Sequence, residues 1–574
     1  MEVRNEKKEL IASFINIEGV TQEEICALIT VPQDSEMGDF ALPCFRFAKA
    51  LRKPPVVIAQ ELRDAILNKD HPFTAVDAVN GYLNFKFNKL EKAKKTLNAV
   101  LSMGENYGTS QEGNGKTVCI DYSSINIAKP FHIGHLSTTV IGGALYRMYK
   151  KLGYNAVGIN HLGDWGTQFG KLIVAFKKWG NREDLEKRGI YALNEIYVKF
   201  HQEAELDPTL DDLARKYFKM IEDGDKEALD LFYWFKELTL REVKKIYARL
   251  DINFDSYNGE AFYNDKMTPV LNELKEKGLT TISDGAEIVD LAEYNMSPCL
   301  LVKADGATLY ATRDLAAAFY RKQTYDFWKC LYVVAYQQNL HFKQVFKVLE
   351  LMGKEWHKDL IHVPFGMVSL EDGTMSTRKG KVVWLEDVLN KSVEKSLEII
   401  SKKNETLANK EAVAEMVGVG AVVFFALSNS RIKDIVFGYD KVLNFDGETG
   451  PYCQYTNARC NSILRKLGNV EEYLREPLTD EELAGVDNKE SDALITLISN
   501  FGSVVSDAVA RYEPSIVTRY IVDVAQSFNK FYLENRILNA DDSQKRARVA
   551  LVYATHVVLK EGLRLIGVQT PEEM

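Results

Sequence analysis

The chain has 574 residues, of which 46% are hydrophobic and 27% charged. This is an ordinary composition for a folded protein, and it excludes the collagen-like and disordered classes. With 72 Lys and Arg against 81 Asp and Glu, the net charge is −9, so a nucleic-acid partner would have to be met by local basic patches. At about 150 residues per domain, the length predicts several domains.

No membrane or export segment is expected. The longest apolar run, Val417 to Leu427, has 11 residues, against the roughly 20 that a membrane span needs. The charged N-terminus lacks the apolar centre of a signal peptide. Seven scattered cysteines, none in C-x-x-C spacing, favour free thiols in a reducing compartment. We therefore predict a cytoplasmic protein that is not bound to membranes.

Residues 1–112 are expected to form a small α+β domain. Helical patterns cover Glu2–Phe14 and Pro55–Leu67, while Gly81–Phe87 alternates with the period of two that is typical of a strand. The polar, glycine-rich stretch Gly104–Gly115 is expected to be a linker.

Residues 113–385 alternate between strand and helix patterns. A charged, helical stretch near 180–250 is interpreted as an insertion. Short apolar runs give the strands, namely Thr117–Tyr122, Ala156–Ile159, Leu331–Ala335 and Ile361–Val363. Asp284-Gly285 and Asp305-Gly306 are hairpin-type turns. The alternation predicts an α/β fold with a doubly wound, mostly parallel sheet of the Rossmann type.

Residues 386–574 show hardly any strand pattern, and we expect an all-α helical bundle. Its clearest helical patterns are Ser491–Tyr512, Ile516–Leu533 and Gln544–Ile566. Gly418-Val-Gly420 lacks the third glycine of a dinucleotide fingerprint, so helix packing is the better interpretation.

The stretch from Asp121 to His135 leaves the first strand of the sheet and enters the first helix, where an open α/β sheet binds its ligand. Free backbone amides at a helix start favour phosphate. His132 and His135 are three residues apart and could face one ligand, and Gly134 would let a flat ring or a phosphate approach the backbone. Taken alone, two histidines are more often core or surface residues. No carboxylate or cysteine stands near them at ligand spacing, so we predict no metal site.

In combination the motifs are more specific. The stretch ending in His132-Ile-Gly-His135 resembles the HIGH signature of class I aminoacyl-tRNA synthetases, and the fuller pattern resembles the arginyl-tRNA synthetase family. Other segments agree in order and spacing, namely Gly163–Gly170, Leu309–Ala316, Tyr336–His341 and Met375–Gly380, the last being similar to the KMSKS loop. The resemblance runs from about residue 20 to the C-terminus.

The resemblance implies a two-step reaction: arginine is activated by ATP to arginyl-adenylate, and the arginyl group then passes to the 3′ adenosine of tRNA-Arg. The catalytic residues that it implies are Lys129, His132, Gly134, His135, Arg378 and Lys379, and those contacting ATP are His132, Gly134, His135, Met375 and Ser376. Arg378 replaces the usual second lysine of the KMSKS loop, and Thr374 stands in place of the first. Lys129 is the candidate for the compensating cation.

An arginine substrate also needs carboxylates that match its rigid guanidinium fork. Asp121 and Asp314 are the candidates, with Tyr310 beside them, while the other ends of the amino acid would be held by Ser124, Asn126 and Gln338. Simpler interpretations stay open, because Asp121 could be a strand-end aspartate and Asp314 a helix N-cap.

The expected partners are tRNA-Arg, L-arginine and ATP with Mg²⁺, and we expect a monomer. The resemblance assigns the anticodon to the C-terminal domain and the tRNA elbow to the N-terminal domain, with activation dependent on bound tRNA. Cations and aromatics that could meet bases share C-terminal segments, namely Tyr455, Arg459, Arg465, Lys466, Arg519, Tyr520, Lys530, Phe531, Tyr532 and Arg536. A solvated basic face over an aromatic core explains each of them equally well, and Arg431 and Lys433 are as ambiguous.

Three alternatives remain from the sequence. The first is another class I synthetase or a HIGH-type nucleotidylyltransferase, which amino-acid-dependent charging would separate. The second is an inactive tRNA-binding relative. The third, a dinucleotide oxidoreductase on the same type of sheet, is disfavoured because the chain has no G-x-G-x-x-G.

Overall fold

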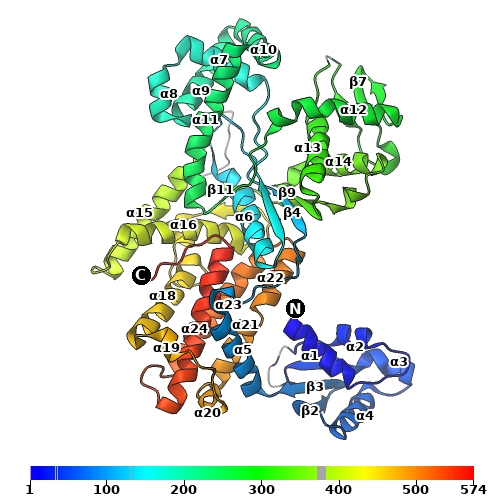
Figure 1. The fold of residues 1–574 in the computed structure, drawn as a ribbon, viewed down its shortest axis with the longest axis vertical. Helices are drawn as coiled ribbons and strands as arrows, with labels where there is room; N and C mark the ends of the chain where they lie inside the picture. The colour runs from blue at the N-terminus through cyan, green and yellow to red at the C-terminus, as the bar shows by residue number, and fades with distance from the viewer. Residues whose placement is uncertain (1, 33, 35–36, 130, 305, 371–382) are drawn as a thin grey trace.

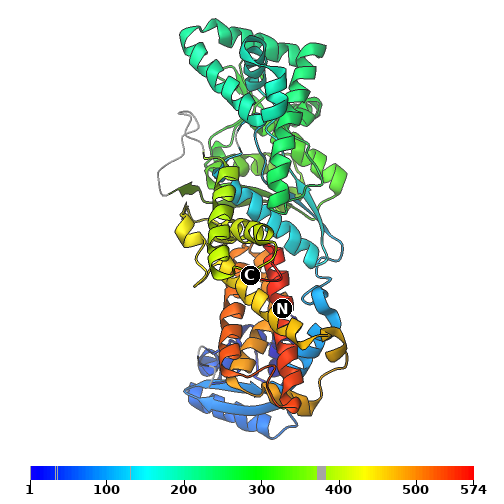
Figure 2. The same cartoon turned by 90° about the vertical axis from the view of Figure 1, so that its left-hand side faces the viewer.

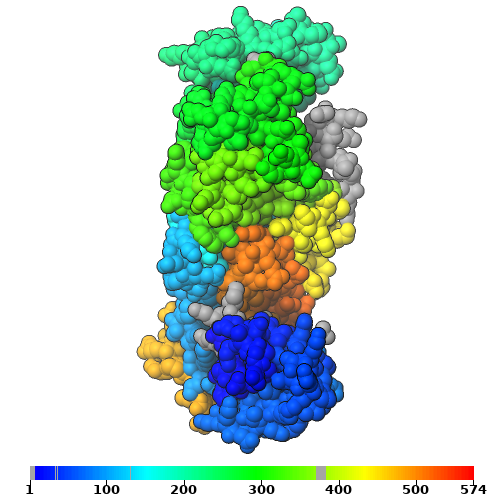
Figure 3. Space-filling view, turned by 90° about the vertical axis from the view of Figure 1, so that its right-hand side faces the viewer, coloured from blue at the N-terminus to red at the C-terminus, as the bar shows by residue number. Residues whose placement is uncertain are grey.

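The computed structural model describes the whole chain except residues 1, 33, 35–36, 130, 305 and 371–382. The molecule is elongated, with a helical insertion at one end, a small N-terminal sheet at the other, and the parallel sheet and C-terminal helices between them (Figures 1 and 2). In the space-filling view, the N-terminal part forms a separate lobe below the rest (Figure 3).

The N-terminal lobe is a three-stranded antiparallel sheet with helices packed on it. Its strands are β1 (Phe40–Pro43), β2 (Phe73–Val79) and β3 (Tyr82–Phe87), in the order β1-β3-β2. Its helices are α1 (Glu2–Ser13), α2 (Gln22–Leu28), α3 (Ala48–Leu51) and α4 (Pro55–Leu67). The expected helices and strand are confirmed, and their apolar faces close a core that is separate from the rest of the molecule.

Helix α5 (Lys89–Met103) follows the N-terminal sheet in sequence but packs elsewhere. Its buried residues Ala93, Leu97 and Val100 belong to the large core that the C-terminal helices share. Lys92 reaches Asp492 at 2.5 Å. The segment we placed in the N-terminal domain therefore contains a helix that docks on the C-terminal bundle (Figure 1).

The central sheet has four parallel strands, as the sequence predicted. They are β4 (Thr117–Asp121), β5 (Asn155–Ile159), β9 (Lys329–Ala335) and β10 (Leu360–Phe365), in the order β10-β9-β4-β5. Helix α6 (Leu136–Lys151) connects β4 to β5, and Gly153 ends this connection with a φ of 79°. The order of the strands reverses between β4 and β9, so a ligand crevice is expected at the carboxyl ends of these two strands.

Two insertions interrupt the alternation. The first is helical, as expected, with α7 (Thr167–Trp179), α8 (Arg182–Arg188), α9 (Ile190–Leu206), α10 (Thr209–Glu222) and α11 (Lys226–Arg249). The second joins an antiparallel sheet, β6 (Thr281–Ser283), β7 (Ala286–Val289) and β8 (Cys299–Val302), to the helices α12 (Met267–Glu276) and α13 (Tyr310–Tyr325). Helix α14 (Asn339–Leu351) belongs to the alternation, because it connects β9 to β10. Asp284-Gly285 forms the expected hairpin turn, with φ angles of 48° and 79°. Asp305, in the other turn, lies outside the described residues.

The C-terminal part is mainly helical, as predicted. Its longer helices are α15 (Leu385–Lys403), α16 (Lys410–Ser428), α18 (Gly450–Leu467), α21 (Lys489–Ser499), α22 (Phe501–Ala510), α23 (Ser515–Glu534) and α24 (Asp542–Leu565). Its short helices are α17 (Tyr439–Val442), α19 (Val470–Tyr473) and α20 (Asp480–Leu483). One strand was missed, β12 (Ile435–Phe437), which pairs with β11 (Val368–Leu370). The helical pattern over Ser491–Tyr512 is confirmed but is divided between two helices, because the chain bends by 44° between α21 and α22.

Helix α16 is the most apolar helix of the bundle. Among the described residues it is the one helix that alone has the length and hydropathy of a membrane span, and 67% of that window is buried inside the fold. Gly418 lies against the Val393 backbone, where a Cβ would approach within 2.6 Å. The interpretation of these glycines as helix-packing positions is confirmed.

Candidate active site

The loop that follows β4 is strained and tightly held. Ser123, Ser124 and Ala128 have φ angles of 69°, 42° and 61°, a left-handed conformation that costs free energy in residues other than glycine. The Ser123 N–H donates to Thr138 Oγ1 at 3.0 Å, and the Ala128 N–H donates to Thr239 Oγ1 at 3.1 Å. These bonds hold an unfavourable backbone at the ligand edge of the sheet, which is typical of a functional site.

His132 and His135 lie against each other at the start of α6, with ring centroids 4.0 Å apart. His132 Nδ1 accepts the Gly134 N–H at 3.1 Å, and His135 Nδ1 accepts the His132 N–H at 3.3 Å. Each neutral ring therefore carries its proton on Nε2. Burial and Lys129 lower the pKa of His132, and burial and His132 lower the pKa of His135 to about 3. At pH 7 the pair can donate two hydrogen bonds but adds no positive charge.

Asp121, at the end of β4, is already paired within the chain. Its Oδ2 lies 2.7 Å from Nη2 of Arg321, whose side chain is 1% exposed, and its Oδ1 accepts the Ser124 hydroxyl at 2.7 Å. Arg321 also lies over the Tyr332 ring, at 5.2 Å from its centroid. The structure thus supplies a protein guanidinium at the carboxylate that we expected to meet the substrate.

Asp314 lies inside α13, four residues after its first residue, so the N-cap interpretation is wrong. Its Oδ2 is 2.5 Å from His341 Nε2. Burial acts to raise the pKa of Asp314, but the hydrogen bond and charge of His341 outweigh it, and the pKa is lowered. Tyr310 and Gln338, the other residues expected near the substrate, are both exposed.

The strained loop also carries Asn126 and Lys129, both exposed. Asn126 pairs with Gly163 as an isolated parallel bridge, and a Cβ at Gly163 would stand 2.4 Å from Asn126 Oδ1. Only glycine at position 163 therefore leaves room for the Asn126 side chain in this position. This bridge joins the Asp121–His135 segment to the Gly163–Gly170 segment.

Glu260 is a candidate that the sequence analysis missed. Its side chain is 15% exposed, and Arg313 Nη1 is 3.9 Å from its Oε2, too far for a hydrogen bond. Burial raises the pKa of Glu260 to about 7, against the opposing effect of Arg313 and with help from Asp314 and Asp164. The charge of Asp314 thus acts on Glu260, so the two carboxylates are close together. Asp314 has a hydrogen bond to His341, whereas the nearest cation of Glu260 is 3.9 Å away.

Asp164 fixes the segment that carries Glu260. This fully buried carboxylate accepts the Ala261 N–H at 2.9 Å and the Lys236 ammonium at 2.6 Å. No local pattern marked Glu260, since it follows the helical insertion in irregular sequence. Only the folding of this segment against the Gly163–Gly170 block brings it to the crevice.

The segment 383–386 ties the histidine loop to the helical insertion. The Ile133 N–H donates to the Val383 carbonyl at 3.2 Å, beside an antiparallel bridge between His132 and Trp384. The Trp384 ring stacks on Tyr191 of α9 at 4.3 Å, and the Tyr191 hydroxyl donates to Glu386 at 2.6 Å. The position of His132 is therefore coupled to α9.

The remaining expected ATP contacts belong to the KMSKS-like segment Met375–Gly380. Met375, Ser376, Arg378 and Lys379, together with Thr374, lie outside the described residues. Within the described part of the chain, no three His, Cys, Asp or Glu side chains are grouped so that they could hold a metal ion.

Comparison with known families supports the motifs. Residues 96–439 match the model of the class I tRNA synthetase (R) catalytic domain, residues 5–87 the arginyl-tRNA synthetase N-terminal domain, and residues 453–574 the DALR anticodon-binding domain. The chain belongs to the arginyl-tRNA synthetase family.

Within the arginyl-tRNA synthetase family, the chain is similar to two proteins named arginine–tRNA ligase. It is 54% identical over 560 residues to that of Alkaliphilus metalliredigens, covering 97% of each chain. It is 52% identical over 575 residues to that of Clostridium botulinum strain Alaska E43, covering 100% of each. The fold is similar to that of Thermus thermophilus arginyl-tRNA synthetase, with a TM-score of 0.83, 23% identity and 100% of both chains covered.

In the C-terminal part of this family member, some aromatic residues are exposed beside a cation. The Arg459 guanidinium lies 5.1 Å from the Tyr455 ring centroid and 5.3 Å from that of Tyr532, and these tyrosines are 42% and 39% exposed. Tyr520 and Phe531, in contrast, are buried in the core. For these two residues the alternative of an aromatic core is confirmed, because both are buried on the inner face of α23.

The remaining C-terminal cations differ in their surroundings. Arg465 pairs with Glu573, and Arg519 donates to the Ser515 carbonyl at 3.2 Å. Arg431 donates to the carbonyls of Tyr512 and Pro364, so its guanidinium ties two segments of the fold together. Arg465 and Arg519 are nevertheless exposed, as are Lys433, Lys466, Lys530 and Arg536.

Proposed function

We propose that this chain, as a member of the arginyl-tRNA synthetase family, activates L-arginine with ATP and transfers the arginyl group to the 3′ adenosine of tRNA-Arg. The observation that carries the proposal is a pair of neutral histidines with Nε2 protons near two buried carboxylates, Glu260 and Asp314; Lys129 acts on the pKa of both histidines and of Glu260, so these groups are close together. The histidines suit the phosphates of ATP, and the carboxylates suit a guanidinium.

In the first step, an oxygen of the arginine carboxylate attacks the α-phosphorus of ATP, and the bond from that phosphorus to pyrophosphate breaks. His132 and His135 would donate from Nε2 to phosphate oxygens, and the exposed Lys129 would supply the positive charge that the neutral rings lack. Gly134 would lie under the adenine. Mg²⁺ would arrive as the counter-ion of ATP. Arg378 and Lys379 are proposed to hold the departing pyrophosphate, with Met375 and Ser376 also contacting ATP.

The selection of arginine would depend on carboxylates placed to meet its guanidinium. Glu260 and Asp314 would bind the guanidinium, while Asp121 positions Arg321 and Ser124 next to the site. A site built for hydrogen bonding rejects analogues without its partner groups by about 10⁴–10⁵-fold, without needing an editing domain. Tyr310, Asn126 and Gln338 remain proposed contacts for the rest of the amino acid.

For the tRNA, we propose that Arg459, Tyr455 and Tyr532 meet anticodon bases, since a cation between two exposed aromatic rings suits stacking. The N-terminal lobe would contact the tRNA elbow. Pyrophosphate exchange with and without tRNA would test the tRNA dependence of activation. A monomeric state and a cytoplasmic location remain predictions, the first open to analytical ultracentrifugation.

The decisive assay is aminoacylation with purified protein, ATP, magnesium, bulk tRNA and each of twenty labelled amino acids. We expect charging by arginine alone. Charging by a different amino acid would overturn the assignment of Glu260 and Asp314. An absence of charging while arginine still binds would favour the inactive tRNA-binding relative.

A further inference from the structure

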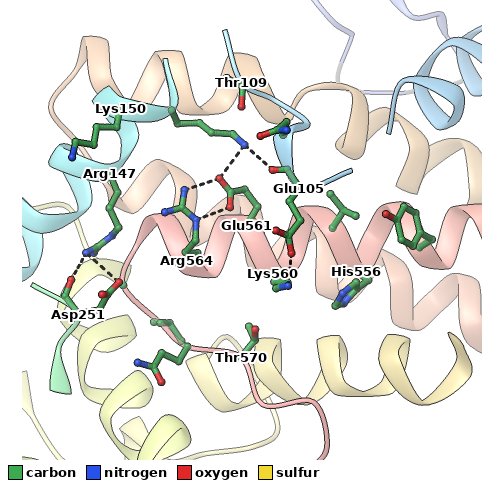
Figure 4. A pocket seen from close by; sticks show the side chains of 17 residues that line it. Glu105, Thr109, Arg147, Lys150, Asp251, His556, Lys560, Glu561, Arg564 and Thr570 are labelled. Carbon is green, nitrogen blue, oxygen red and sulfur yellow. Dashed lines mark hydrogen bonds and ion pairs between the residues drawn. The ribbon is translucent and has the colours of Figure 1, made fainter. Parts of the chain in front are cut away.

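A cavity of about 700 Å³, seen from close by in Figure 4, has none of the candidate active-site residues in its lining. Its walls are the last turn of α6, the linker around Glu105, helix α24 and the tail that follows α24. Lys150 comes fifteen positions after His135 in sequence, so at 1.5 Å per helical residue the cavity is roughly 22 Å from the histidines. It therefore stands where the catalytic and C-terminal parts of the chain meet.

The cavity carries more positive than negative side chains. Its basic residues are Arg147, Lys150, Lys151, Lys560 and Arg564, and its carboxylates are Glu105, Asp251 and Glu561. Burial and Lys560 lower the pKa of the neighbouring His556 to about 4, so this histidine is neutral at pH 7. Five cations against three carboxylates leave an excess of two positive charges.

The carboxylates do not fully compensate the deeper cations. Glu561 is shared, since Lys151 approaches it at 3.0 Å and Arg564 at 2.7 Å. Arg147 donates to the carbonyls of Leu565 and Asp251, and the nearest carboxylate oxygen, that of Asp251, is 3.9 Å away.

Arg147 and Lys151 are also more than nine-tenths buried, at 9% and 5% exposure. Burial lowers the pKa of both groups, and the ion pairs only partly offset it. An anion placed between them would relieve this imbalance, because charge is stabilised most where water is excluded.

Lys150 also lines the cavity, and it is exposed. Its ammonium donates to the Tyr146 hydroxyl at 2.6 Å and lies 4.3 Å from the centroid of that ring, and this hydroxyl donates to Asp255 at 3.1 Å. Among the residues that the structure describes, it forms no ion pair. This exposed lysine can therefore turn to an incoming anion at the loss of one hydrogen bond to a neutral hydroxyl, and no internal ion pair has to break.

We propose that this cavity binds a phosphate group carried by an organic molecule of mononucleotide size. Its volume falls within the roughly 300–1,000 Å³ of small-molecule sites. The phosphate would lie at the end lined by Arg147, Lys150 and Arg564, and the organic part along Tyr553 and Val557 of α24. Because α6 and α24 both supply cations, the ligand would join the catalytic part to the C-terminal bundle. A backbone phosphate of tRNA offers the same chemistry.

The test uses the full-length protein with its active site saturated by the non-hydrolysable 5′-O-(arginylsulfamoyl)adenosine. AMP is then titrated by calorimetry at low salt, and one further equivalent is expected to bind. Lys150→Gln should weaken that binding by about tenfold, the loss expected for one charged hydrogen bond. The control is Lys178→Gln, an exposed lysine in the last turn of α7 just as Lys150 is in the last turn of α6. It should leave AMP binding unchanged.

A second arm separates the two sources of phosphate. If tRNA supplies the group, AMP will not bind, and Lys150→Gln will reduce the slope of log Kd for tRNA against log salt by about one, unlike Lys178→Gln. Either result supports a phosphate site. If AMP fails to bind and both variants show the wild-type salt slope for tRNA, the proposal is overturned.

Discussion

At the scale of single residues, the candidate active site combines two neutral histidines that can donate hydrogen bonds with buried carboxylates that can bind a cation. The hydrogen bonds at Nδ1 leave the protons of His132 and His135 on Nε2, so both rings act as donors without charge. Glu260, in contrast, has a pKa raised to about 7 because it is buried and its nearest cation is 3.9 Å away. A carboxylate in this state is stabilised by a cationic ligand.

Glu260→Gln is therefore expected to raise the KM for arginine by about 10- to 100-fold, the loss of one charged interaction with the guanidinium. The measurement is the aminoacylation rate against arginine concentration. Glu287→Gln is the matched control, since Glu287 is 13% exposed and pairs with Lys275 at 3.2 Å outside the crevice. Equal KM values in the two variants would remove Glu260 from the pocket.

The same carboxylate predicts a pH dependence. Arginine should bind the ionised form of Glu260, so kcat/KM for arginine rises as pH increases through about 7. For stability the sign is opposite: between the ordinary value of 4.5 and about 7, the folded state keeps a proton that the unfolded state releases, so this group's contribution falls as pH rises. A pH profile of kcat/KM for wild type and Glu260→Gln checks the first effect. A step near pH 7 that persists in the variant would contradict it.

At the scale of elements, the histidine loop is positioned from outside itself. Its backbone pairs with the segment 383–385, and Trp384 in that segment stacks on Tyr191 of α9. The helical insertion thus helps to set the place of His132, although the two are some 60 residues apart in sequence. A misplacement of about 1 Å in such a group can cost about 10²-fold in rate.

We expect Tyr191→Ala to lower the rate of arginyl-adenylate formation by about tenfold or more with little change in the KM for arginine. Tyr191→Phe keeps the ring and should restore most of the rate, because only the hydrogen bond to Glu386 is lost. Tyr197→Ala, on the same helix but against His201, is the control. Pre-steady-state measurement of adenylate formation with tRNA present distinguishes them. A wild-type rate in Tyr191→Ala would show that the stack does not position His132.

At the scale of the whole molecule, the linker and α5 join three parts of the chain. Tyr107 stacks on the buried Phe501 of α22 at 6.4 Å, and the Tyr107 hydroxyl donates to the Ile498 carbonyl. Gly108 has a φ of 77°, and a Cβ there would stand 2.6 Å from the Phe501 ring. The linker is therefore a packed joint between the catalytic and C-terminal parts.

Gly108→Ala should lower the melting temperature by several degrees more than Gly115→Ala. Both residues have positive φ, so both substitutions cost about 1 kcal/mol in backbone strain. Only the methyl at 108 meets Phe501, since a Cβ at 115 meets nothing within 4 Å. Differential scanning calorimetry of the two variants provides the comparison. Equal melting temperatures would mean that Phe501 moves away from the added methyl group without lowering the stability of the fold.

The proposed boundaries near residues 112 and 385 depend on the same joint. Helix α5 follows the N-terminal sheet in sequence, yet its apolar face is buried against α21 and α24. A helical pattern indicates that one face is buried, but it does not indicate which partner covers that face.

The sequence by itself determined the elements and the family. Periodicity placed the strands of the parallel sheet and the helices α1, α4, α23 and α24 within a few residues, because apolar spacing reflects local geometry, and the motifs around His132 and Gly163 identified the family. Tertiary structure alone decided the partners: Arg321 at Asp121, the approach of Glu260 to the crevice, and the burial of Tyr520. These depend on contacts between residues far apart in the chain. No local pattern encodes them, because the free energy of a carboxylate depends on the charges and solvent that the fold places around it.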